Sequence, residues 1–256
     1  MEVYVKKEDS ILKYDNTFNK TSLSLLTKVQ SNVLISILSC MKTLDDNNCY
    51  TASFTFKDIR EITGMKDLYA SRIKKVFDEL LDTKVEFYDA NTDIYIKGHL
   101  FSHYQLINNK SEVSITLTKI LTNKLTPTSE KYTILQLEEY MSLSNSYSRE
   151  LYRLLRQFKH TGIKLITKDE LIAILQPPKS YNEYDFIRKV IMPATEENKQ
   201  YFQNLTVSIK DNKLPNLIKF KFKPHIIKKQ SSLGKNAINT ADKELLDYVS
   251  KHGMDI

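Results

Sequence analysis

Hydrophobic and polar positions along this chain change between a helical period and a strand period, and the same order of changes occurs twice. From Thr27 the apolar residues recur every three or four positions, as on one face of a helix, and residues 50–56 are then extended. A short helix ending at Gly64, a longer helix to about Asp82 and alternating strands to Leu117 are predicted to follow. A helix-turn-helix followed by a β-hairpin is the arrangement of a winged helix.

The second occurrence of this order runs from Ser144 to Phe222. Its predicted elements are a helix capped by Ser144 or Ser146, a strand, a short helix, a basic helix and a β-hairpin, at residues 144–158, 164–166, 170–175, 181–201 and 205–222. Pro193 is expected to kink the basic helix or to restart it at Ala194, because proline cannot donate a hydrogen bond inside a helix. The chain is therefore predicted to be an α+β protein with two tandem winged-helix domains.

Local signals define several boundaries within this plan. Three predicted helices begin with a threonine whose third neighbour can complete a capping box, at Thr27, Thr55 and Thr167. The segment 133–141 is predicted to be a short helix, and the polar stretch around Pro127 is the expected domain boundary. The predicted parts of the chain are a first domain, a second domain and a loosely ordered polar tail, at residues 1–126, 127–228 and 229–256.

Positive charge is concentrated in the second occurrence. Residues 145–230 hold 17 Lys and Arg against 8 Asp and Glu, whereas the rest of the chain holds 21 against 23. A local basic excess suits a polyanion, of which nucleic acid is the commonest. Cys40 and Cys49 form no metal-binding spacing and indicate a reduced, cytoplasmic setting. The N-terminus lacks the apolar stretch of a signal peptide and no apolar run approaches the length of a membrane span, so no membrane partner is expected.

The sequence offers little for catalysis. Its five histidines form no His-x-His pair, and there is no glycine-rich phosphate-binding loop. His99 and His103 fall on one side of a predicted strand, as a metal pair would, but no acidic or cysteine ligand accompanies them. We therefore expect no catalytic residue, no metal site and no cofactor. A metal-dependent nuclease is kept as the alternative from another class of protein.

Two stretches of the second occurrence resemble a known family. They are NSYSRELYRLL at Asn145–Leu155 and YDFIRKVIMPA at Tyr184–Ala194. Together with the strand IKFKF at 218–222 and, more weakly, the capped helix at 27–41, they resemble the Rep_3 plasmid replication initiators. These are iteron-binding proteins built from two winged-helix domains. The resemblance covers roughly residues 10–225.

The resemblance implies a function for both domains. The two winged helices would bind successive major grooves of direct repeats at a plasmid origin, and dimers formed through the first domain would bind an inverted repeat at the protein's own promoter. Host replication proteins would be recruited and AT-rich DNA opened, with no DNA cleavage or nucleotide hydrolysis. The protein would be a non-enzymatic DNA-binding protein of the bacterial cytoplasm, associated with the plasmid and nucleoid. A stand-alone winged-helix transcriptional repressor is the alternative with the same fold.

Candidate contacts with double-stranded DNA lie mainly in the second domain. The turn and the outer face of the basic helix contribute Lys179, Ser180, Tyr181, Asn182, Asp185, Arg188 and Lys189. Arg188 suits a guanine and Asn182 an adenine. Tyr181 could instead lie at the rim of the core, and Asp185 could be a helix cap.

The remaining candidates are expected to position the protein on the DNA backbone. The predicted wing contributes Lys210, Lys213, Lys219 and Lys221. Ser146 and Arg149 lie at a predicted helix N-terminus, where they suit a phosphate or simple capping. The equivalent contacts of the first domain are Arg72, Lys74 and Lys75.

Overall fold

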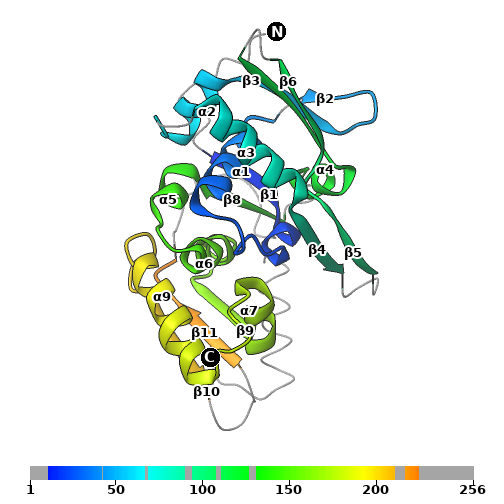
Figure 1. The fold of residues 1–256 in the computed structure, drawn as a ribbon. Coiled ribbons are helices and arrows are strands. Elements are labelled where there is room, and N and C mark those ends of the chain that lie inside the picture. The colour runs from blue at the N-terminus through cyan, green and yellow to red at the C-terminus, as the bar shows by residue number, and fades with distance from the viewer. Residues whose placement is uncertain are drawn as a thin grey trace, which may run out of the picture.

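The computed structural model describes residues 11–41, 43–66, 69–89, 94–107, 111–126, 131–210 and 217–224. Its first winged-helix unit comprises α1, β3, α2, α3, β6 and β7, at Lys28–Cys40, Tyr50–Thr55, Phe56–Thr63, Ala70–Asp82, Phe101–Ile107 and Glu112–Leu117. β7 pairs with both β3 and β6, and the short β2 (Thr43–Leu44) extends the sheet beyond β3. α1 packs against both α2 and α3, and α3 also packs on β6 (Figure 1).

The second unit, in the lower part of Figure 1, repeats this topology. It comprises α6, β9, α7, α8, η3, α9, β10 and β11, at Ser146–Arg156, Ile163–Thr167, Lys168–Leu175, Glu183–Asp185, Phe186–Ile191, Met192–Asn198, Thr206–Lys210 and Leu217–Lys221. β11 pairs with both β9 and β10, just as β7 pairs with both β3 and β6. The repeated order of hydrophobic patterns therefore corresponds to a repeated topology. The polar tail predicted at 229–256 lies outside the described residues.

A β-hairpin separates the third helix from the wing in the first unit only. β4 (Lys84–Asp89) and β5 (Ile94–His99) form a two-stranded sheet between α3 and β6. The buried Leu100 separates β5 from β6.

Two strands outside the winged helices pair across the chain. β1 (Ile11–Asp15) runs antiparallel to β8 (Tyr132–Gln136), and the helix α5 (Leu137–Ser142) begins only after β8. The helix predicted for 133–141 is therefore wrong in its first part, because the strand partner lies in a distant part of the sequence and pairing overrides local preference. The strand pair and α4 (Lys119–Leu125), which packs on β1, surround the predicted boundary after residue 126, which stays a prediction.

Helix ends follow the local signals closely. All three predicted capping boxes form; in the first, the Gln30 amide donates to Thr27 Oγ1 at 3.3 Å and the Thr27 amide donates to Gln30 Oε1 at 2.7 Å. Gly64 ends α2 in the left-handed conformation, as predicted. The cap of α6 differs from the prediction, because Asn145 rather than Ser144 or Ser146 accepts the hydrogen bond from the first turn.

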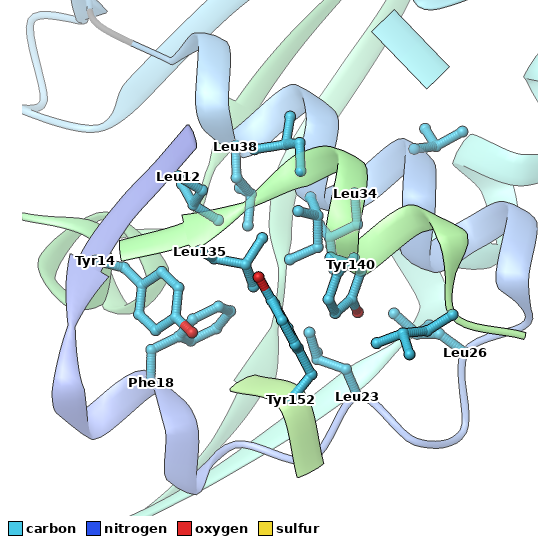
Figure 2. Packing of buried hydrophobic residues seen from close by; sticks show 14 of the residues in the cluster. Leu12, Tyr14, Phe18, Leu23, Leu26, Leu34, Leu38, Leu135, Tyr140 and Tyr152 are labelled. Carbon is cyan, nitrogen blue, oxygen red and sulfur yellow. The ribbon is translucent and has the colours of Figure 1, made fainter. Parts of the chain in front are cut away.

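Side chains from several elements meet in one buried cluster around α6 (Figure 2). Tyr14 of β1 and Phe18 of η1 (Asn16–Lys20) pack edge to face with ring centroids 5.2 Å apart. Tyr140 of α5 and Tyr152 of α6 belong to the same cluster, and both are fully buried. Burial raises the pKa of Tyr14 to about 12, so its hydroxyl stays protonated and donates to Asn19 at 2.8 Å. The cluster joins the two units through α6.

The helix of the second helix-turn-helix is composite, and we use "composite helix" for α8, η3 and α9 together. η3 is a π-helical stretch, in which the Met192 amide donates to the Ile187 carbonyl five residues earlier. The backbone stays right-handed helical from Asp185 to Met192, so the predicted restart at Ala194 does not occur. The π-helical turn ends directly before Pro193. In a regular α-helix, a proline ring would clash with the carbonyl four residues earlier. The π-helical stretch thus allows the helix to continue through Pro193.

Candidate nucleic-acid interface

The turn before the composite helix presents four of the predicted DNA contacts. Lys179, Ser180 and Asn182 are exposed, and Tyr181 is half-buried against the core. The side-chain oxygen of Asn182 caps the helix by accepting from the Asp185 amide at 2.9 Å. The side-chain NH2 group of Asn182 takes no part in that bond. Its contact with a DNA base stays a prediction.

Arg188 lies on the outer face of the composite helix and is exposed. Its guanidinium lies 5.8 Å from the ring centroid of Tyr184, and Nη1 donates to the Tyr184 hydroxyl at 3.3 Å. Tyr184 and Met192 are 65% and 51% exposed, although both are large and hydrophobic. They precede and follow Arg188 by four residues, so the three side chains can form one stripe. Neither Tyr184 nor Met192 was predicted as a contact from the sequence, although this spacing was a signal that could have found them.

Lys189 has a partner within the helix. Its Nζ lies 2.9 Å from Asp185 Oδ1 and 4.9 Å from the ring centroid of Tyr181. The hydrogen bond to Asp185 raises the pKa of Lys189. Asp185, which was predicted as a DNA contact, thus holds Lys189 in place. Its backbone amide is the group that Asn182 caps.

The second wing carries its basic side chains on one face. Lys221 is exposed and Lys219 is half-buried, whereas Ile218 and Phe220, which alternate with them, are buried, as predicted. Lys210 ends β10 opposite Leu217. Lys213 lies outside the described residues. The wing therefore offers cations at spaced positions along the sheet, which suits a DNA backbone.

The start of α6 differs from the site predicted for a phosphate. Arg149 is buried, and its Nη1 donates to the carbonyls of Leu143 and Ser144 at 3.0 and 3.2 Å. Glu197 accepts from the Ser144 amide and hydroxyl at 2.6 and 2.8 Å, so a carboxylate of the chain itself already lies beside this helix end. Burial opposes the charge on Glu197, but these hydrogen bonds and others like them outweigh it and lower its pKa. Arg149 is therefore not proposed as a DNA contact. Ser146 is half-buried at the same end of the helix.

On the equivalent surface of the first unit, basic side chains lie close to acidic side chains of the same helix. Arg72, Lys74 and Lys75 are exposed on α3, as predicted. Lys74 and Lys75 each have an acidic partner one turn later, at 3.5 Å from Asp78 and 3.9 Å from Glu79. The described strands of the first wing contain no lysine or arginine.

Within the described residues, no group of three or more His, Cys, Asp and Glu side chains is placed to hold a metal ion. His99 lies 2.9 Å from the Leu81 carbonyl, and His103 is exposed on β6. No helix in the described part of the chain has the length and apolarity needed to cross a membrane.

Comparison with known proteins decides the family. The family model Rep3_N, described as "Initiator Replication protein, WH1", matches residues 11–156, which is more than half of the chain. The chain belongs to this family of replication initiators. The match confirms the resemblance inferred from the sequence and agrees with the prediction of a non-enzymatic protein. It ends at Arg156, the last residue of α6.

Two individual proteins extend the family match beyond the first unit. A probable replication protein from Bifidobacterium longum (strain NCC 2705) is 23% identical over 196 residues, which span 74% of this chain and 64% of that protein's length. The Pi initiator protein, whose crystal structure was solved in complex with iteron DNA, superposes with a TM-score of 0.63 at 18% identity. That superposition covers 85% of this chain and 98% of the Pi chain. It confirms the α+β fold with tandem winged helices.

Proposed function

We propose that this initiator binds direct repeats at a plasmid origin and starts replication there. Both winged helices contact successive major grooves, with the composite helix as the main reader of bases. Arg188 carries this proposal, because it is the exposed arginine on the outer face of that helix and lies between the exposed Tyr184 and Met192. Arginine is the commonest side chain to read guanine. The iteron complex of the similarly folded Pi initiator supports the same use of the fold.

Further roles follow from the same proposal. Bound to the repeats, the protein helps to open adjacent AT-rich DNA and recruits host replication proteins. As a dimer formed through the first unit, it binds an inverted repeat at its own promoter and represses its own synthesis. It acts in the bacterial cytoplasm, on the plasmid and nucleoid.

Replication from a minimal plasmid tests this function. The plasmid carries only this gene and its flanking DNA, in a permissive host that lacks other initiators for it. We expect stable maintenance of the plasmid, and its loss when Arg188 is replaced by Ala with protein levels unchanged. A plasmid that fails to replicate while the protein still represses a reporter from its own promoter would favour the stand-alone repressor instead.

A further inference from the structure

A buried ion pair on α6 joins the second unit to the first. Glu150 and Arg153 are 2% and 1% exposed, and Arg153 Nη1 lies 2.9 Å from Glu150 Oε2. Neither side chain faces the DNA-reading surfaces described above. Both instead contact the segment Phe18–Leu23, which connects β1 to α1 in the first unit.

The contacts with that segment are all directional. Arg153 Nη2 donates to the Phe18 carbonyl at 2.7 Å, and Nη1 donates to the Thr21 carbonyl at 3.2 Å. The Leu23 amide donates to Glu150 Oε2 at 3.2 Å. The Arg153 guanidinium also lies 4.7 Å from the ring centroid of Phe18, which Figure 2 shows packed beside Tyr14. A planar guanidinium that meets two carbonyls and a carboxylate admits little rotation.

The same segment is held at a second point. Asn19 Nδ2 donates to Thr133 Oγ1 at 2.8 Å and to Gln157 Oε1 at 3.2 Å, directly after α6. On its opposite side, α6 receives the side chain of Asn198, whose Nδ2 donates to the Ser148 carbonyl at 2.9 Å. Asn198 ends the composite helix. Contacts therefore run without interruption from the first unit, through α6, to the helix that carries Arg188.

Burying two charges is costly, and in some proteins a buried ion pair specifies one geometry rather than adding stability. We propose that Glu150 and Arg153 are positioning residues that fix how the two units are set relative to each other, and thereby fix the spacing of the two DNA half-sites that one molecule can bind. This inference rests on the proposed function. In tandem readers the distance between half-sites follows from the geometry of the protein.

The test uses the full chain and a DNA duplex that it selects from a random library. Derivatives of this duplex carry one, two or three extra base pairs between the two segments that the bound protein protects from cleavage. The variant is Glu150→Leu with Arg153→Met, because replacing a whole buried ion pair by apolar residues of similar size usually preserves folding. The matched control is Arg149→Met, which removes a buried arginine from the same helix, one that donates to Leu143 and Ser144 beside its own helix end.

For the natural protein and for Arg149→Met, we expect about tenfold weaker binding with the first inserted base pair. For the double variant, we expect the affinities across the series to differ by less than about threefold. If the double variant does not fold, Arg153→Lys keeps the charge without the planar fork, and a spacing profile broader than that of the natural protein is expected.

A folded double variant, or a folded Arg153→Lys, that keeps the natural spacing profile would overturn the inference and leave the proposed function intact. Selection of no sequence over random duplex would overturn both.

Discussion

The two winged-helix units share one topology but differ in the surface that faces outward. In the first, α3 carries three basic and three acidic residues, and the exposed lysines pair with acids on their own helix. In the second, Lys189 likewise pairs with Asp185 on its own helix, but Arg188 lies beside the exposed Tyr184, and the wing adds Lys219 and Lys221. When a lysine approaches a DNA phosphate, an acidic partner on the same helix either loses its ion pair with that lysine or repels the phosphate. The fold is thus duplicated, and we propose that the second unit contributes more to DNA binding than the first.

The two units also differ at the glycines that follow their helices. Gly162, after α6, has φ +71°, and a Cβ there would lie 2.4 Å from the Phe222 carbonyl oxygen. Gly64, after α2, has φ +67° with nothing within 4 Å of such a Cβ. We expect Gly162→Ala to lower the free energy of unfolding by about 3 kcal/mol, since it adds a clash to the backbone strain. Gly64→Ala should cost about 1 kcal/mol.

Urea unfolding of both variants measures this difference. Equal decreases in stability would contradict the close approach of the Gly162 turn to the final strand.

Arg188 and Arg72 provide the most direct comparison of the reading surfaces. We expect Arg188→Ala to weaken binding to the selected duplex by about 1–3 kcal/mol, because alanine cannot make the bidentate hydrogen bonds to a base. Arg72→Ala should weaken it by less than about 0.7 kcal/mol, as for a single backbone contact on a balanced surface. Fluorescence anisotropy titrations at one fixed salt concentration measure both. A larger effect of Arg72 would reverse the assignment of the main reader.

The wing lysines should affect how binding depends on salt. Replacing both Lys219 and Lys221 by Gln is expected to reduce the slope of log K against log salt by about 1.8, at about 0.9 for each phosphate that is no longer neutralised. Replacing Lys74 and Lys75 by Gln should change the slope less, since both lysines already have acidic partners. Titrations over a salt series distinguish the two outcomes, and identical slopes for the two double variants would show that the two surfaces contribute equally.

The helix before each turn ends differently in the two units. Gly64 ends α2, but Gln176 occupies the equivalent place after α7 with φ 47°, in the left-handed region. We expect Gln176→Gly to raise the free energy of unfolding by up to about 1 kcal/mol, because glycine adopts this conformation without a Cβ penalty. A higher melting temperature with unchanged DNA affinity would agree, and a lower one would mean that the Gln176 side chain has a role in packing.

Glu197 should contribute to the acid sensitivity of the second unit. Its pKa is lowered below the ordinary value of 4.5, so its contribution to stability is present above that value and is lost as the pH falls through the lower folded pKa. We expect Glu197→Gln to flatten this acid loss of stability, measured as urea midpoints between about pH 7 and about pH 3. Glu196→Gln, on the exposed neighbour bonded to Lys199, is the control and should keep the natural slope.

Local chemistry explains why much of the fold could be predicted. The capping boxes at Thr27, Thr55 and Thr167 form within three residues, so their signals lie in the sequence itself. Alternating apolar positions likewise predicted both faces of the second wing. Strand β8 was missed because its partner β1 is remote, and the π-helical stretch before Pro193 was not anticipated from the proline alone.

The candidate site was predictable where exposure follows the helix period, as for Arg188 and Lys189. It was not predictable on α6, because charged residues on a helix are normally exposed and only the tertiary structure reveals their buried partners. The Asn145–Leu155 motif that carries the family resemblance contains Arg149, Glu150 and Arg153, all buried. Of these three, Glu150 and Arg153 contact the segment Phe18–Leu23 of the first unit, whereas Arg149 contacts its own helix end.

The central claim is that the protein reads a specific sequence, and mainly through its second unit. A competition titration tests it most directly: the full chain bound to a labelled duplex of the direct repeats beside the gene, challenged with unlabelled repeat or shuffled duplex at physiological salt. The account predicts a preference of about a thousandfold or more for the repeats, largely abolished in Arg188→Ala and retained in Arg72→Ala. Equal competition by shuffled duplex, or a preference that survives Arg188→Ala but not Arg72→Ala, would contradict it.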